Sequence, residues 1–381
     1  MAYEIDFVGV GSEVKQDADA ICFRWKYGSD YWGNPLYKVG VFDGGFEAHG
    51  KKMVEHMNQY YFNSSNFQTG RVSKVINFIL VSHPDQDHTI GIKTILENFT
   101  VEKIYMNRPW LYIEELWEKV NDGRITKDSL YRRLREKYKT IAEIEDIALG
   151  KGIPIYEAFQ GEEIEGSLLI ASPSKQFYLT LIVESDKTPL EENLPASDKT
   201  IMNDAFHFLK SVTNYVLSLV EDWYKELLRE DVETTPDNET SIVLRGIVDG
   251  DGFLLVGDAG VRALNEAMDY LDSLCEDVKE YVQFYQVPHH GSRHNINPST
   301  LNRMLGSKVA EGETRNKTAI ASVAQNSDHP LKMVTNAYIR RGVTVYTNDG
   351  ITFWHHKGDM PDRSWSVATP ILFSEKVEEY D

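Results

Sequence analysis

Hydrophobic and polar positions alternate over much of the first eighty residues, which predicts a β-rich beginning. The segments YEIDFVGVG, AICFRWKYG and KVGVFDGG carry this pattern, and the last ends in a Gly-Gly turn after Asp43. A helix is expected at about residues 47 to 61. The run KVINFILVS, residues 74 to 82, is almost continuously apolar. A run of this length and character predicts a strand that is buried on both faces.

Apolar residues at a spacing of three to four predict helices after this strand and again from Trp110 to Gly150. Residues 182 to 200 are polar and contain two prolines, so an exposed loop is expected there. A further helix is expected near residues 203 to 230. Its apolar stripe comprises Phe206, Leu209, Val212, Val216, Leu219 and Trp223. This stripe would pack on the protein's own core or, alternatively, form a dimer contact.

The most concentrated chemistry lies in HPDQDH, directly after the apolar strand. Two histidines and two aspartates (His83, Asp85, Asp87 and His88) occupy six consecutive positions. Imidazole nitrogens and carboxylate oxygens suit Zn²⁺, Mn²⁺ or Fe²⁺. The alternative, helix-capping acids with incidental histidines, explains so dense a group poorly. The segment therefore predicts a metal site between a strand and a helix, where α/β folds usually place their chemistry.

Three later strand ends carry related residues. FLLVGDAG contains Asp258, YQVPHHGS contains His289, His290 and Ser292, and AIASVAQNSDHP contains Asn326 and His329. Each signal is weak alone, because a Gly-Asp turn is common and a lone His-Pro is more often structural. Together they indicate that several strands deliver ligands to one site.

The composition limits the partners. The chain has 381 residues, 41% hydrophobic and 26% charged, with a net charge of −19. A protein that grips duplex DNA normally has a basic face, so a nucleic-acid role would need a local basic patch, a metal site or a partner subunit. Two cysteines suit a reducing compartment. With no signal peptide and no apolar stretch near ~18 residues, we expect a cytoplasmic protein without membrane contact.

As a set, these segments resemble the metallo-β-lactamase fold superfamily. HPDQDH is similar to its His-x-(His/Asp)-x-Asp-His signature and VGDAG to its strand end with a bridging aspartate. VPHHGS, DHP and VYTNDGITF resemble the ComEC-type branch, which comprises nuclease-like domains of bacterial DNA-uptake proteins and their stand-alone relatives. The resemblance covers about residues 5–100 and 235–355. It implies an α/β fold, a four-layer αββα sandwich forming a single domain over 1–381, with helical insertions at about 105–150 and 178–235.

The resemblance also implies a ligand set for two divalent metal ions, manganese or zinc. His83 and Asp85 would hold one ion, Asp87 and His88 the other, Asp258 would bridge, and His289 would complete the second ion's ligands. The family's usual additional histidine would fall in LLIASPSKQ, residues 168 to 176, which has none. The resulting carboxylate-rich site favours Mn²⁺, or one tightly and one loosely bound ion.

The implied activity is a metal-dependent hydrolase using a metal-activated hydroxide, most simply a phosphodiesterase or nuclease. Asp87 would orient the nucleophile and accept its proton, and His329 would stabilise an oxyanion or protonate the leaving group. His290, Ser292 and Asn326 would contact substrate, and Asp43 would orient a ligand histidine.

Two other functions stay open. One is hydrolysis of a lactam, lactone or thioester, and the other is a partner-docking subunit with a weakly active metal site. The expected partners are a nucleic acid or nucleotide substrate, an additional protein encoded alongside, and a second copy bound through the helical insertions.

Overall fold

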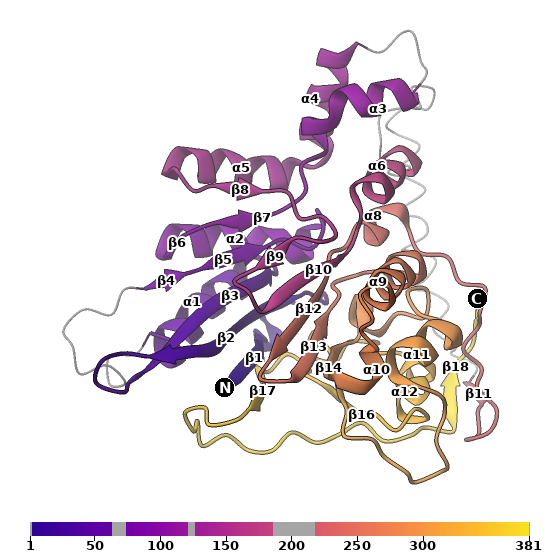
Figure 1. Ribbon diagram of the computed structural model, residues 1–381. Helices are drawn as coiled ribbons and strands as arrows, with labels where there is room; N and C mark the ends of the chain where they lie inside the picture. Colours follow the sequence, from indigo (N-terminus) through magenta and orange to yellow (C-terminus); the bar gives the residue numbers. More distant parts are fainter. Residues whose placement is uncertain (1, 63–73, 121–125, 186–217, 381) are drawn as a thin grey trace.

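The computed structural model describes residues 2–62, 74–120, 126–185 and 218–380. Two seven-stranded sheets pack face to face, and helices cover the outer face of each (Figure 1). The expected four-layer αββα sandwich is therefore confirmed.

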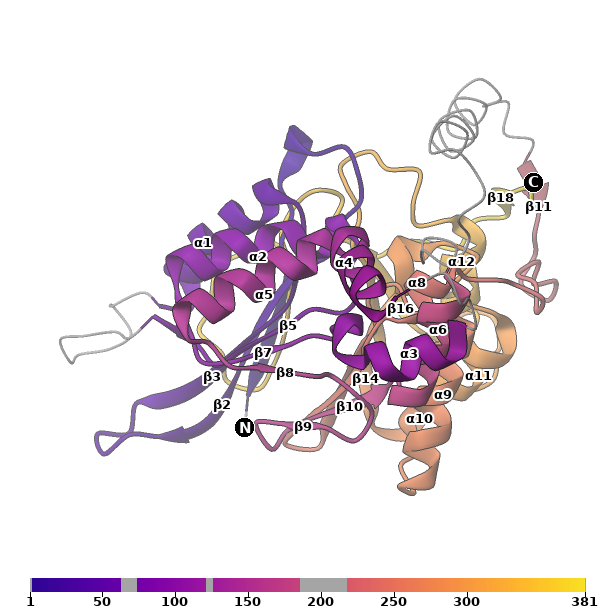
Figure 2. The same ribbon diagram turned by 90° about the horizontal axis from the view of Figure 1, so that it is seen from above.

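The first sheet has the strand order β17-β1-β2-β3-β5-β7-β8, with parallel pairing from β3 to β8. Its strands are β17 (Phe353–Lys357), β1 (Tyr3–Phe7), β2 (Ala20–Ser29), β3 (Pro35–Gly44), β5 (Phe78–Leu80), β7 (Ile104–Tyr105) and β8 (Ile155–Tyr156). A small sheet pairs β4 (Val75–Ile76) with β6 (Thr100–Val101). Helices α1 (Glu47–Tyr60), α2 (Gln86–Asn98) and α5 (Lys139–Lys151) lie together on the outer face of the large sheet (Figure 2).

The second sheet has the order β16-β15-β14-β13-β12-β10-β9, with parallel pairing from β13 to β16. Its strands are β16 (Thr344–Thr347), β15 (Thr318–Ala321), β14 (Val282–Gln286), β13 (Asp251–Leu255), β12 (Val243–Val248), β10 (Leu168–Ser172) and β9 (Glu163–Ile164). Its helices are α6 (Lys175–Glu184), α8 (Pro236–Glu239), α9 (Val261–Ser273), α10 (Val278–Tyr281), α11 (Pro298–Leu305) and α12 (Lys332–Ile339).

Three hydrophobic clusters correspond to the three interfaces between the four layers. The central cluster is rich in aromatic rings from both sheets, among them Phe23, Phe78, Phe253 and Phe284. A second cluster lies under α1, α2 and α5, and a third lies under α9, α11 and α12. Strands buried on both faces explain why apolar runs such as residues 78–80 lack polar alternation.

Between β7 and β8 the chain forms the short turn η3 (Pro109–Tyr112) and helices α3 (Ile113–Val120), α4 (Lys127–Lys137) and α5, where the sequence predicts helices. Thr126 caps α4, because its side chain accepts a hydrogen bond from the Ser129 backbone N–H. Leu130 and Leu134 provide the buried face of α4. Helices α3 and α4 project from the sandwich at the top of Figure 1.

The prediction of a helix near residues 203 to 230 is wrong for residues 218–230, the part that the structure describes. Residues Ser218–Val220 form strand β11, which pairs antiparallel with β18 (Lys376–Glu378). The Trp223 indole N–H donates to the Val309 carbonyl, 3.1 Å away. These partners are distant in sequence, so local periodicity could not reveal them. Phe206, Leu209, Val212 and Val216, with most of the loop expected at 182–200, lie outside the described residues.

Within the described residues, no helix has the length and apolar character needed to cross a membrane.

Candidate metal centre

The polar residues found at the strand ends meet at one edge of the sandwich. The segment after β5 carries His83 to His88, the segment after β13 carries Asp258, and the segment after β14 carries His289 and His290. The turns are joined directly, since the His289 backbone N–H donates to the Gly257 carbonyl at 3.1 Å. Residues that are distant in sequence therefore share one site, as strand ends in α/β proteins often do.

Asp258 lies at the centre of the group, and its two carboxylate oxygens face different histidines. Its Oδ1 is 3.3 Å from His88 Nε2. Its Oδ2 is 3.7 Å from His83 Nε2 and 3.5 Å from His289 Nε2. On the Oδ2 side, His83 Nε2 also lies 3.8 Å from Asp85 Oδ2. One carboxylate thus contacts two sets of donor atoms.

The set on the Oδ1 side is the more compact. Ligand atoms of Asp87, His88, Asp258 and His290 all lie within 4.8 Å of one another. Asp87 Oδ2 is 3.6 Å from His88 Nε2 and 3.5 Å from His290 Nε2. Asp87 and His88 occupy the first turn of α2, where the helix dipole stabilises the carboxylate.

The Nδ1 atoms of these histidines bond outward, which directs each Nε2 toward the centre. His88 Nδ1 is 2.8 Å from Asp43 Oδ2, so the expected orienting contact of Asp43 is present. His83 Nδ1 is 3.0 Å from Ser82 Oγ, whose hydroxyl in turn donates to Asp43. A single buried carboxylate thereby fixes two imidazoles, as outer residues commonly do for metal ligands.

The later pair follows the same rule. His289 Nδ1 lies 2.8 Å from Asn295 Oδ1, and His290 Nδ1 lies 2.7 Å from the Ser322 carbonyl oxygen. These partners hold a proton on Nδ1, so each ring binds a cation through Nε2 once Nε2 carries no proton.

Several buried polar atoms in the centre lack a hydrogen-bond partner. They include the Nε2 atoms of His83, His88 and His290, together with Asp258 Oδ1. Buried polar groups almost always have a partner, so these four unpaired atoms around the Asp258 carboxylate are suited to binding a ligand. The donor set of imidazoles and carboxylates fits divalent cations, and the chemistry of the site therefore suits a metal ion.

The charges of the centre shift its pKa values strongly. Burial lowers the pKa of His88, but Asp258 and Asp87 outweigh it and hold this pKa well above its usual value. Burial also opposes the charged form of His290, yet the neighbouring Asp87 and Asp258 carboxylates raise its pKa to about 10. Burial would raise the pKa of Asp87, but the neighbouring His88 holds it below its usual value. Two protonated imidazoles thus balance the carboxylates, and a divalent cation would replace those protons.

The positions of His289 and His290 relative to the ligand group differ from those expected from the sequence. His290, expected to face substrate, lies in the compact group with Asp87 and His88, whereas His289 lies on the Oδ2 side of Asp258. The cause is the backbone, since both histidines have left-handed φ angles of 46° and 58°. Gly291 continues this turn at φ 92°, and a side chain there would collide with Pro330. Such unusual backbone is sterically costly and concentrates at functional sites.

The remaining expected residues occupy different places. Ser292 is buried and its Oγ accepts a hydrogen bond from the His294 backbone N–H. Asn326 is exposed, and its backbone N–H donates to Asp349. Neither contact connects these two side chains to the ligand group. In the segment 168–176, the hydroxyl of Ser172 donates to Glu266 on α9.

Two aspartates that the sequence reasoning did not identify lie beside the centre. His329 Nδ1 is 3.1 Å from Asp17 Oδ2, and Asp17 also accepts from the Ser327 hydroxyl and the Ala324 N–H. Asp19 is buried, and burial raises its pKa to about 6. The available signal was VKQDADA in the β1–β2 connection, where two acids alternate before a buried strand.

Comparisons with known proteins match this chain by structure and not by sequence. No family model matches the chain, and no curated protein matches its sequence. A long-form RNase Z from yeast is similar in structure, with 11% identity and a TM-score of 0.35, over 84% of this chain and 37% of RNase Z. The metallo-β-lactamase SMB-1, in a complex with 2-mercaptoethanesulfonate, has 9% identity and a TM-score of 0.29, over 79% of this chain and 86% of that protein.

This chain thus spans little more than a third of that RNase Z. The layer order of this chain, with helices outside two facing sheets, is the one expected from the sequence resemblance.

Proposed function

We propose that this protein is a metal-dependent phosphodiester hydrolase. The observation that carries the proposal is the convergence of two donor sets on the two oxygens of Asp258. The proposed site for two cations comprises three carboxylates and four imidazoles. The imidazoles are held in place by hydrogen bonds of their Nδ1 atoms to residues outside the centre. Such preorganisation is costly without a ligand.

The residues divide between two positions. Asp87, His88 and His290 would hold one ion with Asp258 Oδ1, and His83, Asp85 and His289 would hold the other with Asp258 Oδ2. The ions would supply the positive charge that stabilises negative charge developing on a phosphoryl group. Because the first set is the more compact, we propose one tight and one looser ion, and three carboxylates beside four imidazoles suit Mn²⁺ or Zn²⁺.

Protein side chains would handle the protons. The Asp87 side chain is 26% exposed, so it can reach an attacking water and accept its proton while also contacting the ions. Asp17 holds the Nδ1 side of His329, whose side chain is 35% exposed. The other ring nitrogen of His329 can then donate to a leaving oxygen. Asp17 is a positioning residue in this scheme.

Phosphodiester chemistry is preferred over lactam opening for two reasons. Three carboxylates among the seven ligand side chains provide oxygen donors that suit the ions used for phosphoryl transfer. The resemblance of VPHHGS and DHP to the ComEC-type branch points to the same substrates, and a nuclease is the most direct reading.

A screen with Mn²⁺ tests the proposal. We expect wild-type protein to hydrolyse at least one of single-stranded DNA, duplex DNA, RNA and a cyclic dinucleotide. The variant Asp87→Ala should lose this activity, and Asp269→Ala, at an exposed position of α9, should retain it. Equal activity of wild type and Asp87→Ala on every substrate would contradict the proposal. Opening of lactams with phosphodiesters untouched would favour the alternative hydrolase.

The affinity for Mn²⁺ should rise with pH. The pKa values of His88 and His290 are raised, so both rings are protonated near neutral pH and must lose these protons before binding a cation. Titration calorimetry between pH 6 and 8 in buffers of different ionisation enthalpy should show release of about two protons. A pH-independent affinity with no proton release would show that these imidazoles do not bind the ion.

A further inference from the structure

We infer that Gln286 and Asp19 form a positioning pair, which holds the turn that carries Asp258 in place against the first turn of α2. That turn of α2 carries Asp87 and His88. The inference rests on the metal centre of the proposed function and deepens it, because it names the residues that set how the two ion positions lie relative to each other.

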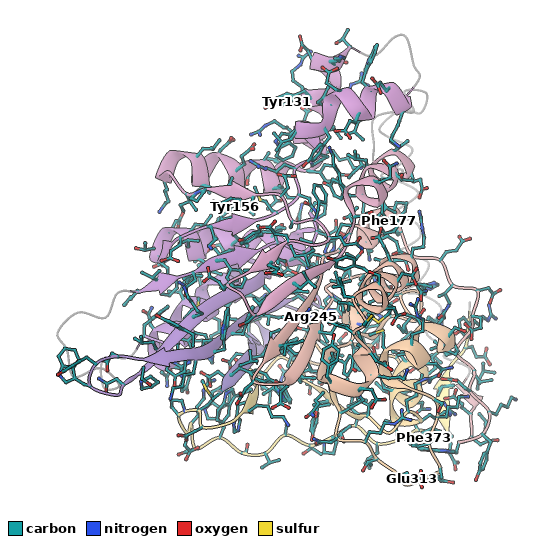
Figure 3. The ribbon with its side chains drawn as sticks, in the orientation of Figure 1. Tyr131, Tyr156, Phe177, Arg245, Glu313 and Phe373 are labelled. Carbon is teal, nitrogen blue, oxygen red and sulfur yellow. The ribbon has the colours of Figure 1, made fainter. Side chains whose placement is uncertain are left out.

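The pair connects the two sheets through the layer between them. Gln286 is the last residue of β14 and follows two positions after Phe284, whose ring belongs to the apolar cluster between the sheets. Because side chains alternate along a strand, Gln286 is directed into the same layer. Side chains fill this layer (Figure 3), and there Gln286 Nε2 donates to Asp19 Oδ2 at 2.8 Å. Asp19 directly precedes β2, so this hydrogen bond joins the second sheet to the first.

The carboxamide oxygen of Gln286 holds the turn that carries Asp258. Gln286 Oε1 accepts hydrogen bonds from the backbone N–H groups of Val256 at 2.8 Å and Gly257 at 3.0 Å. The turn has little room to shift, because Gly257 has a φ angle of 52° and a Cβ there would lie 2.8 Å from Ser82 Oγ. In such close packing, the Gln286 carboxamide determines where the Asp258 carboxylate begins.

Asp19 contacts the other side of the centre. Its backbone N–H donates to the Asp87 carbonyl at 3.2 Å, and its Oδ2 lies 3.8 Å from His88 Nδ1. Asp19 Oδ1 is buried and has no hydrogen-bond partner in the part of the chain that the structure describes. The hydrogen bond from Gln286 therefore orients this carboxylate. Both side chains are buried, with 1% of each residue exposed, so water does not compete for the bond.

The charge of Asp19 favours the metal-bound protein over the apoprotein. An ionised carboxylate is unfavourable at this place without cations, because it is buried and the carboxylates of Asp43 and Asp258 repel it. Divalent cations in the centre would offset that repulsion. A role in positioning the centre therefore predicts an effect on cation binding, whereas a role in the core alone predicts an effect on the stability of the apoprotein.

The first test compares the same substitution at two positions of β14. Gln286→Met keeps the size of the side chain and removes both of its hydrogen-bonding groups. Gln283→Met is the control, because Gln283 Oε1 accepts from Asn316 and Lys357 near the opposite end of the strand. We expect the affinity for Mn²⁺ to fall by about 10- to 100-fold in Gln286→Met. The control should remain within about threefold of wild type, since its contacts do not reach the centre.

The second test reverses the direction of the hydrogen bond. Gln286→Glu still offers an oxygen to the backbone N–H groups of the turn, but it opposes the Asp19 carboxylate and should lower the affinity for Mn²⁺. In Asp19→Asn/Gln286→Glu the asparagine amide can donate to the glutamate, and the net charge equals that of wild type. Asp19→Asn should therefore raise the affinity in the Gln286→Glu background, whereas in wild type it removes a negative charge and should not raise it. Such a reversal measures the coupling of the two residues.

Three measurements are made on each variant. Titration calorimetry of metal-free protein with Mn²⁺ gives the affinity and the number of ions, at a temperature where circular dichroism shows that the variant is folded. Electron paramagnetic resonance of the Mn²⁺-loaded protein distinguishes a magnetically coupled pair from isolated ions. We expect the coupled pair in wild type and in Gln283→Met, and isolated ions in Gln286→Met. Urea unfolding gives the stability of the apoprotein.

Two results would overturn the inference. One is a loss of apoprotein stability in Gln286→Met with the Mn²⁺ affinity and spectrum of wild type, which would make the pair part of the core alone. The other is an Asp19→Asn/Gln286→Glu variant that binds Mn²⁺ no better than Gln286→Glu, because the hydrogen bond would then not matter to the centre.

The proposed function is tested separately by the hydrolysis of phosphodiesters. If the variants bind Mn²⁺ as expected but wild type cleaves no phosphodiester, the hydrolase fails and the positioning pair stands. If wild type cleaves a phosphodiester and Gln286→Met binds Mn²⁺ as wild type does, the positioning pair fails and the hydrolase stands. If wild type binds no divalent cation, both are overturned.

Discussion

Asp258→Asn is expected to lower phosphodiester hydrolysis by about 10³-fold or more, equivalent to several kcal/mol of lost transition-state stabilisation. Asparagine has the same shape but carries no charge, and only one of its two terminal atoms can bind a cation. The Asp258 oxygens lie 3.3 to 3.7 Å from the Nε2 atoms of His88, His289 and His83. The exchange therefore weakens both positions at once. Metal analysis of the purified variant should show loss of bound ion in parallel with activity.

Two comparison variants isolate the cause. Asp269→Asn makes the same chemical change at a side chain that is 74% exposed, and it should leave metal content and rate unaltered. His329→Ala should lower the rate by about 10²-fold or more while bound metal is retained, because in the proposed mechanism His329 transfers a proton and binds no ion. If Asp258→Asn keeps both its metal and its rate, Asp258 does not join two positions.

Arg363→Met is expected to lower the free energy of unfolding by about 3 to 5 kcal/mol. The Arg363 guanidinium lies 2.6 Å from Asp6 Oδ1 and 2.9 Å from Glu4 Oε2, and the three side chains are at most 2% exposed. Four aromatic rings surround the guanidinium, those of Tyr60, Tyr61, Trp354 and Trp365. Methionine fills the space but removes the guanidinium from both buried carboxylates, so that Glu4 keeps only Arg24 as a cationic partner and Asp6 keeps only His56. Urea unfolding measures the change.

Arg303→Met provides the matched control. Arg303 lies 2.8 Å from Asp269 and 2.7 Å from Asp272, but its side chain is 33% exposed, so the expected loss is below about 1 kcal/mol. The double variant Asp6→Asn/Arg363→Met should recover part of the stability, because it removes a buried unpaired charge. Equal losses for Arg363→Met and Arg303→Met would show that burial of the charge is not decisive.

The Arg363 cluster also illustrates what the sequence conceals. Glu4 and Asp6 lie in a strand whose pattern alternates polar and apolar, which suggests one solvated face, yet every residue of β1 is buried. The polar face is covered by α1 and by a segment from the end of the chain that supplies Arg363. Alternation shows that two faces differ, but it does not show what covers each face.

The sequence predicted the part of the candidate metal centre whose residues lie close together in the chain. His83, Asp85, Asp87 and His88 fall within one turn between a strand and a helix, so their proximity follows from chain connectivity. Asp258 was added as a bridging ligand from the resemblance of VGDAG. The division of His289 and His290 between the two sides of its carboxylate required the packed structure.

Other features depended on tertiary contacts from the start. The separation of His289 from His290 follows from consecutive left-handed residues, which a pair of adjacent histidines does not predict. Asp17 meets His329 across more than three hundred residues. The strand at residues 218–220 pairs with residues 376–378 and overrides a helical periodicity.

From the sequence, hydrophobic periodicity and chain connectivity, which act over a few residues, predicted the strands and helices, the local ligand loop and the ligand-bearing strand ends, whereas the layered architecture came from the family resemblance. Only the tertiary structure decided how the ligands divide around Asp258, which acid contacts His329, and that the junction of α4 and α5 adjoins the ligand loop. These features arise where separate segments pack together, and the interaction energies that fix them act between residues that the sequence keeps far apart.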